Sequence, residues 1–219
     1  MLEPNSSPAD ALLPCEPLGF ASARMLLQEV NGRLLDLLVL ASQNPNASGL
    51  PLALDLRDVL EHMDPTARER AAASPFLLVE FGFRDAARWS SVRGVVESIN
   101  PREGYFPHPQ ALELAQMTLI LAWSLVRSNR DAAFVMLGVS PACAGIVADL
   151  RLQDLQRIAA ERSAWIRPRW ETRADVWRRL LSTADTLVSP PPDQLGTHGL
   201  KLFFGNLFSN EPAGKSGRP

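Results

Sequence analysis

The chain has 219 residues, of which 46% are hydrophobic and 21% are charged, and its net charge at pH 7 is −2. This length can bury a core as one domain or as two small ones. The near-neutral charge excludes a molecule-wide positive field that would attract nucleic acid, so any DNA contact must come from a local basic surface. A weak strand signal favours an all-α fold with at most short strands.

The first 22 residues predict neither a signal peptide nor a membrane anchor. Residues 1–22 hold four prolines among small and acidic residues, and we expect a disordered arm there. No run in the chain reaches the roughly 18–20 apolar residues of a membrane span. Cys15 and Cys143 are too few and too differently placed for a disulfide framework. The sequence therefore predicts a soluble cytoplasmic protein without membrane contact.

Residues 23–91 form the predicted N-terminal helical half. A long amphipathic helix is expected from Ala23 to Ser42, because apolar residues recur there at steps of three and four. Asp64 and Pro65 form a helix N-cap followed by a first-turn proline. Phe76–Phe83 is the best strand candidate. The Gly- and Pro-bearing segment 92–109 is the predicted linker to the next half.

A second long helix opens the region 110–188. One of its faces includes Leu112, Leu119, Trp123 and Val126, and the opposite face is apolar as well. A helix that is apolar on two sides needs two neighbours to cover it. We therefore predict that Leu112, Leu119, Trp123 and Val126 form an oligomer interface.

The spacing of apolar residues in the first long helix recurs in the second at a distance of 85 residues. The residues concerned are Leu27, Val30, Leu34, Leu37, Leu38 and Ala41, followed by Leu112, Ala115, Leu119, Ala122, Trp123 and Val126. One interpretation is a degenerate tandem repeat, in which one chain imitates a dimer. The alternative is that any two amphipathic helices of this length share such spacing, and the sequence leaves both open.

A tight helical corner follows the second long helix. Gly138 suits a helix end that needs a positive φ, and Ser140 with Pro141 caps and begins the next helix. Two further short amphipathic segments run to Ala159. The three together predict a compact block with the general shape of a helix-turn-helix domain.

These residues resemble the FlhD family of flagellar transcriptional regulators. The resemblance rests on four segments: Leu119–Ala122 leading to Ala133–Val139, then Ala148–Leu152, Ile158–Ala159 and Arg167–Trp170. It covers about a third of the chain, roughly Leu112 to Leu181. Its elements are a leucine-rich helix, the Leu137-Gly138 turn and a short aromatic–arginine exit.

The resemblance implies a helical protein that oligomerises and activates transcription at promoter DNA, together with an FlhC-like, zinc-containing partner subunit. Some family members carry an inter-subunit cysteine where this chain has Ile166, so that covalent link cannot form here. The usual family chain is about half as long. The resemblance itself implies no cofactor and no catalysis.

The basic charge is concentrated where the family's DNA-binding end would lie. Residues 151–183 hold eight arginines and four carboxylates, whereas the remainder holds 14 basic and 20 acidic residues. An extended Trp165–Trp170 would place Trp165, Arg167 and Arg169 on one face, with the two arginines outward, and Ile166, Pro168 and Trp170 on the inward face. On the following helix Arg178 and Arg179 point away from an apolar stripe. We predict phosphate contacts by Arg167, Arg169, Arg178 and Arg179.

The plainer interpretation of these arginines is a solvated helical surface whose charges pair with nearby carboxylates. We predict that Trp165, Trp170 and Trp177 pack in the core and do not stack on bases. Acidic pairing of Arg167 and Arg169 in the folded chain would favour a protein without DNA binding.

Residues 189–219 are predicted to be a flexible tail with an apolar segment. Leu202, Phe203, Phe204 and Leu207 belong to that segment, which either docks on a partner or folds back on its own domain.

An enzyme is not predicted. The three histidines are scattered, neither cysteine has metal-ligand spacing, and nucleotide-binding or nucleophile motifs are absent from the sequence. Two functions remain: a FlhD-like transcriptional regulator, or a non-enzymatic interaction and assembly module on the same helical fold.

Overall fold

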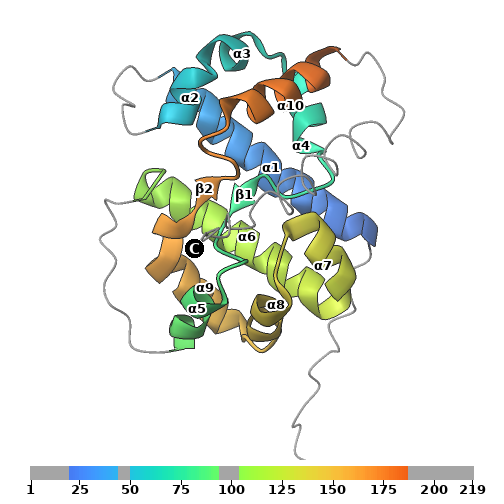
Figure 1. Cartoon of the computed structure of the whole chain (residues 1–219), viewed down its shortest axis with the longest axis vertical. Coiled ribbons are helices and arrows are strands. Elements are labelled where there is room, and N and C mark those ends of the chain that lie inside the picture. Colours follow the sequence, from blue (N-terminus) through green and yellow to red (C-terminus); the bar gives the residue numbers. More distant parts are fainter. Residues whose placement is uncertain (1–19, 44–49, 94–103, 187–219) are drawn as a thin grey trace, which may run out of the picture.

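The computed structural model describes residues 20–43, 50–93 and 104–186, which contain ten α-helices and one two-stranded sheet (Figure 1). The all-α prediction is confirmed. Most of the predicted N-terminal arm, most of the predicted linker and the whole tail, with Leu202, Phe203, Phe204 and Leu207, lie outside the described residues. Among the described residues, no single helix is long and apolar enough to cross a membrane, although the bent pair of helices Arg130–Leu137 and Pro141–Ala148 passes that test when the two are taken together.

Helices make up most of both halves of the described chain, and each half also contains one short strand. The N-terminal half contains α1 (Phe20–Ser42), α2 (Pro51–Asp55), α3 (Arg57–His62), α4 (Pro65–Ala72), β1 (Val79–Glu80), α5 (Ala86–Ser90) and η1 (Ser91–Arg93). The C-terminal half contains α6 (His108–Ser128), α7 (Arg130–Leu137), α8 (Pro141–Ala148), α9 (Leu152–Arg162), η3 (Ser163–Trp165), β2 (Arg167–Pro168) and α10 (Ala174–Thr186).

Local sequence signals set several helix ends. The Asp64 carboxylate accepts a hydrogen bond from the Ala67 amide at 2.8 Å, and Ser140 accepts one from the Cys143 amide at 3.3 Å. Each cap satisfies an amide that has no partner inside its helix. Gly138 ends α7 at φ 70°, the left-handed conformation that glycine adopts without strain. The predicted helical corner is therefore confirmed.

The predicted strand Phe76–Phe83 is much shorter than expected. Only Val79 and Glu80 form β1, which pairs antiparallel with β2 in the register Val79↔Pro168 and Glu80↔Arg167. Beyond Glu80 the chain turns at Gly82, whose φ is 70°. This turn ends β1. In the partner strand β2, Pro168 has no amide hydrogen to donate to a longer ladder.

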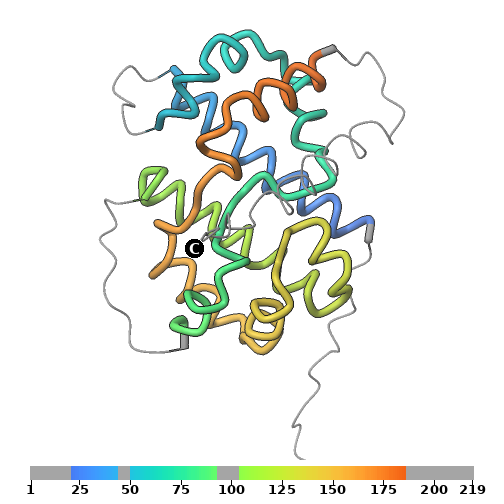
Figure 2. Tube along the Cα trace, viewed as in Figure 1, coloured from blue at the N-terminus to red at the C-terminus, as the bar shows by residue number. Residues whose placement is uncertain are grey.

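The long helices α1 and α6 pack against each other in the centre of the molecule and run in opposite directions (Figure 2). Their buried faces belong to one continuous hydrophobic core, which extends into both halves of the chain. Arg33 on α1 forms an ion pair with Glu113 on α6 at 2.5 Å. The second apolar face of α6 is therefore covered inside the chain, by α1 on one side and by α7, α8 and α9 elsewhere.

Each half contributes one helix to the other. The orange helix α10 lies on α3 and α4 at the top of Figure 1, although it ends the C-terminal half. The green helix α5 of the N-terminal half lies beside α8 at the bottom. Because both helices reach across the β1–β2 pair, the two halves are interleaved rather than separate.

Candidate nucleic-acid interface

The basic region of the C-terminal half comprises the end of α9, the turn η3, strand β2 and helix α10. The predicted apolar stripe of α10 is buried and consists of Val176, Trp177, Leu180 and Leu181. Trp177 also donates a hydrogen bond from Nε1 to the Arg169 carbonyl at 2.7 Å. The stripe holds α10 on the molecule with its opposite face toward solvent.

Arg167 lies on β2 with its side chain 45% exposed, as the sequence pattern predicts. Its Nη1 donates to Glu171 Oε1 at 3.1 Å. A pair this exposed contributes little stability, typically about 0–1 kcal/mol. A phosphate oxygen can replace the carboxylate at low cost.

Arg169 does not point outward, and this part of the prediction is wrong. It is only 8% exposed; its Nη2 donates to the Leu137 carbonyl at 2.7 Å, and Glu80 Oε2 lies 3.9 Å from its Nε. Burial lowers the pKa of Arg169 to about 10, although Glu80 opposes the shift. The alternation of an extended strand fails here because β2 ends at Pro168 and the chain then turns, with Trp170 at φ 55°.

Arg178 lies on the surface but is tied to the N-terminal half. Its Nη1 donates to Asp58 Oδ2 on α3 at 2.7 Å, and its Nη2 donates to the Asp55 carbonyl. The Arg178 guanidinium is the main reason that the pKa of Asp58 lies below its ordinary value of 3.8. Arg178 thus holds α10 to the end of α2 and the start of α3.

Arg179 is exposed on α10, one position along from Arg178. Within the described ranges it forms no ion pair with a carboxylate. Of the four predicted phosphate contacts, Arg167 and Arg179 are therefore accessible, Arg178 is partly engaged and Arg169 is buried.

The structure adds a basic cluster that the sequence pattern did not reveal. The Arg88 guanidinium carbon lies 4.1 Å from the centre of the Trp165 ring, and that of Arg162 lies 5.4 Å from it. Trp165 is 4% exposed and Arg162 is 6% exposed. Arg88 belongs to α5, more than 70 positions before the others, so only the tertiary structure brings them together.

The predicted oligomer interface faces the protein's own core. Leu119 and Val126 are 0% and 1% exposed, and Leu112 and Trp123 are half-buried. Trp123 Nε1 donates to the Leu150 carbonyl at 2.8 Å. In the folded chain Leu119 and Val126 are thus unavailable to a second subunit, because α1 and the following helices already cover α6.

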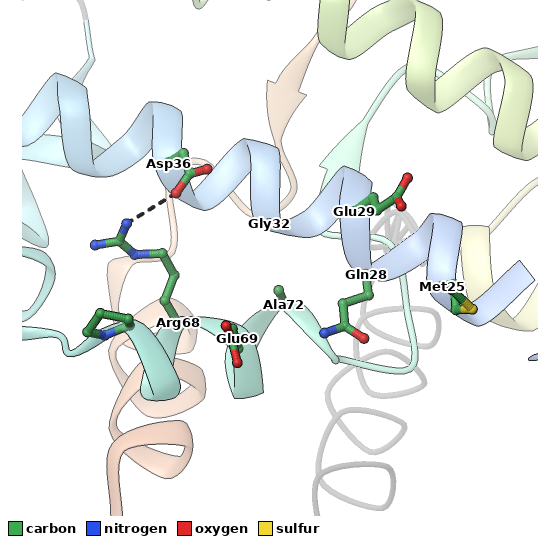
Figure 3. Close-up of a pocket in the computed structure, with 9 residues that line it drawn as sticks. Met25, Gln28, Glu29, Gly32, Asp36, Arg68, Glu69 and Ala72 are labelled. Carbon is green, nitrogen blue, oxygen red and sulfur yellow. Dashed lines mark hydrogen bonds and ion pairs between the residues drawn. The ribbon is translucent and has the colours of Figure 1, made fainter. Parts of the chain in front are cut away.

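Two other hollows lie outside the basic region. A small one between α6 and α9, of about 140 Å³, is lined by Gln116, Ile120, Leu152, Leu155 and Gln156. A larger groove between α1 and α4, of about 540 Å³, carries the carboxylates of Glu29, Asp36 and Glu69 (Figure 3). Its one arginine, Arg68, already pairs with Asp36 at 3.2 Å. This groove is acidic and would repel a phosphate backbone.

No group of three or more histidine, cysteine or acidic side chains that could hold a metal ion occurs in the described part of the chain. Cys143 is buried, and burial raises the pKa of its thiol. A thiol in this environment is a poor nucleophile.

Residues 110–191 match the model of the family described as flagellar transcriptional activator (FlhD). The resemblance found in the sequence is thereby confirmed, and the match covers the C-terminal half from α6 to just beyond α10. No curated protein and no solved structure matches the chain. The matched family is one of transcriptional activators and not of enzymes. Arg88 and the rest of the N-terminal half lie outside the matched residues.

Proposed function

We propose that this protein is a transcriptional regulator that works as FlhD-like proteins do, by contacting promoter DNA with its arginine-bearing C-terminal half. The observation that carries the proposal is the family match over residues 110–191, which includes the basic region described above. Such a protein acts in the cytoplasm, without a cofactor and together with an FlhC-like zinc-containing subunit.

Among the predicted contacts, Arg167 and Arg179 bind phosphate in this proposal, while Arg169 and Arg178 position the elements that carry them. Arg169 joins β2 to the end of α7, and Arg178 joins α10 to the N-terminal half. Phosphate contacts of this kind supply affinity and register but read no bases. Sequence selectivity is assigned to the FlhC-like partner.

We further infer that the N-terminal half replaces the second subunit of a dimer. Three relationships support a tandem repeat: the antiparallel packing of α1 on α6, the antiparallel pairing of β1 with β2, and the exchange of α5 and α10 between halves. An antiparallel arrangement of corresponding elements is what a local two-fold axis produces. The hetero-oligomer with the partner then contains this chain as a ready-made pair of units.

The proposal is tested by a gel-shift titration of promoter DNA with the full-length chain plus its co-purified partner, over a series of salt concentrations. Wild type is expected to bind with an affinity that falls steeply as salt rises. The double variant Arg167→Glu with Arg179→Glu should lose at least about tenfold in affinity, since it replaces two phosphate donors by like charges.

A matched control changes the same number of charges elsewhere. Arg24→Glu with Arg130→Glu alters two exposed arginines on α1 and α7 and should retain nearly wild-type binding. Equal losses in both double variants would show a general charge effect and would remove the assignment to Arg167 and Arg179.

A second candidate function is an assembly module on the same fold that does not bind DNA. The observation in its favour is that Arg167 and Arg169 both pair with carboxylates, at 3.1 Å from Glu171 and 3.9 Å from Glu80, which is the outcome expected for a protein without DNA binding. Arg178 is also engaged within the chain, by Asp58. Co-purification with a protein partner, combined with no salt-dependent DNA shift by the complex, would select this function over the first.

A further inference from the structure

Arg88 is held in a conformation that leaves its charge uncompensated by a close carboxylate. Its guanidinium lies over the Trp165 ring, and its side chain also lies close to Gly82, where an added Cβ would be 3.5 Å from Arg88 Cδ and 3.6 Å from Nη1. Within the described residues Arg88 forms no ion pair. The Arg88 side chain is thus close to both an indole ring and a glycine turn.

Two further guanidinium groups lie close to Arg88. The charges of Arg167 and Arg162 both lower the pKa of Arg88, in addition to the larger effect of burial, and Asp85 and Glu80 oppose the shift only in part. Arg162 is 94% removed from solvent, and its Nε is buried without a hydrogen-bond partner in the described structure. Like charges gathered in this way cost free energy, and an anion among them relieves that cost.

The surrounding carboxylates are occupied elsewhere. Glu80 accepts the Gly82 amide, Asp85 caps α5 through the Arg88 amide, and Glu171 pairs with Arg167. Glu161, next to Arg162 in sequence, pairs with Arg157. Of these carboxylates only Glu171 pairs with an arginine of the cluster. Within the described residues Arg88 and Arg162 therefore have no carboxylate in ion-pair contact, although the charges of Asp85 and Glu80 act on Arg88.

We propose that Arg88 and Arg162, which both lie over the Trp165 ring, form together with the neighbouring Arg167 a binding site for one phosphate group of a nucleic-acid backbone. Arg88 and Arg167 supply the donors at the surface, and the buried Arg162 supplies fixed positive charge beside Trp165. Guanidinium groups that are already ordered lose little conformational freedom on binding phosphate, and planar donors suit its oxygens. The ligand class rests on the proposed function, although the site itself does not.

The site joins the two halves of the chain. Arg88 comes from α5, outside the region that matches the FlhD family, whereas Arg162 and Arg167 come from α9 and β2 inside it. A phosphate at this position would contact both halves at once. The N-terminal half therefore takes part in DNA binding directly, and is more than a structural substitute for a second subunit.

The first experiment measures intrinsic tryptophan fluorescence of the full-length chain during titration with sodium pyrophosphate at constant ionic strength. Binding beside Trp165 should change the emission of wild type and leave Trp165→Phe unchanged, and Arg88→Gln should abolish saturation. Arg127→Gln is the matched control, because Arg127 also stacks on a tryptophan, with its guanidinium carbon 4.7 Å from the Trp123 ring. Circular dichroism confirms that each variant is folded.

The second experiment measures duplex DNA affinity against salt for wild type, Arg88→Gln and Arg88→Lys. Loss of one phosphate contact should weaken binding about tenfold and reduce the slope of log affinity against log salt by about one. Arg88→Lys should recover part of both. An unchanged affinity and slope in Arg88→Gln, with wild type binding normally, overturns the site and leaves the proposed function intact.

If wild type binds no DNA, the proposed function falls and the pyrophosphate titration decides the site alone. Saturable, Arg88-dependent binding of pyrophosphate then supports a phosphate site for another ligand. Absence of Arg88-dependent binding in both experiments overturns it.

Discussion

The Arg169 guanidinium donates a hydrogen bond from Nη2 to the main-chain carbonyl of Leu137 at 2.7 Å, and the Arg169 residue is buried, with only 8% of its surface exposed. The bond joins the end of β2 to the last turn of α7, just before the Gly138 corner. The Arg169 amide also donates to the Leu78 carbonyl at 2.7 Å. Arg169 therefore fixes the strand pair against the helical corner, and its charge serves the fold.

Replacement of Arg169 should destabilise the protein rather than weaken DNA binding selectively. Arg169→Ala leaves the Leu137 carbonyl without this donor and Glu80 without its cationic neighbour, at a cost of about 3 kcal/mol in the free energy of unfolding. Urea unfolding followed by circular dichroism measures the loss. Arg179→Ala, an exposed change nearby, should stay within about 0.5 kcal/mol of wild type. Equal stability of the two variants would contradict the structural role of Arg169.

A second prediction concerns Asn31, a fully buried amide on α1. Its Nδ2 donates to the carbonyls of Ala72 and Phe76 at 3.2 and 3.0 Å, and its Oδ1 accepts the Leu78 amide at 2.8 Å. Asn31→Leu should therefore lower the free energy of unfolding by about 2–4 kcal/mol, because three main-chain groups each lose their hydrogen bond to the Asn31 amide.

Thermal unfolding followed by circular dichroism measures the effect of Asn31→Leu. Gln28→Leu is the matched control on an exposed position of the same helix. A melting temperature for Asn31→Leu equal to that of the control would show that the three hydrogen bonds contribute nothing net.

A third prediction follows from the long helix α6. Leu119 is fully buried inside the chain, so Leu119→Ala should cost about 2–5 kcal/mol of stability. It should not convert a dimer into folded monomers. Light scattering combined with urea unfolding separates these effects, and Ile120→Ala, at a position 43% exposed, is the control. A Leu119→Ala variant that stays folded but has half the wild-type mass would contradict this prediction and would show that Leu119 lies in a subunit interface.

The pair between Arg178 and Asp58 predicts a pH dependence. The pKa of Asp58 is lowered in the folded protein, mainly by its hydrogen bond to Arg178. Its stabilising contribution is therefore fully present above the unfolded value near 3.8 and is lost as pH falls through the lower folded pKa. The melting-temperature difference between wild type and Asp58→Asn should shrink as pH is reduced below 3.8.

The control for that prediction is Asp185→Asn on α10, at an exposed position for which the described structure holds no ion pair. Its melting temperature should differ little from wild type at neutral pH. A difference for Asp58→Asn that stays constant down to acid pH would show that the carboxylate charge is unimportant there.

The sequence by itself determined the helical class, the caps at Asp64 and Ser140, the left-handed turn at Gly138 and the family resemblance. Each of these depends on neighbours a few positions apart in the chain, and local sterics and hydrogen bonding decide them. The buried stripe of α10 is of the same kind, because helical periodicity places its residues on one face.

Only the tertiary structure decided which arginine side chains are exposed and which helices cover α6. Arg169 and Arg167 are two positions apart, yet the turn after Pro168 and the carbonyl of Leu137 bury one and leave the other exposed. Arg88 meets Trp165 across the fold. Such relationships depend on contacts between residues distant in sequence, and the period of a single element carries no information about them.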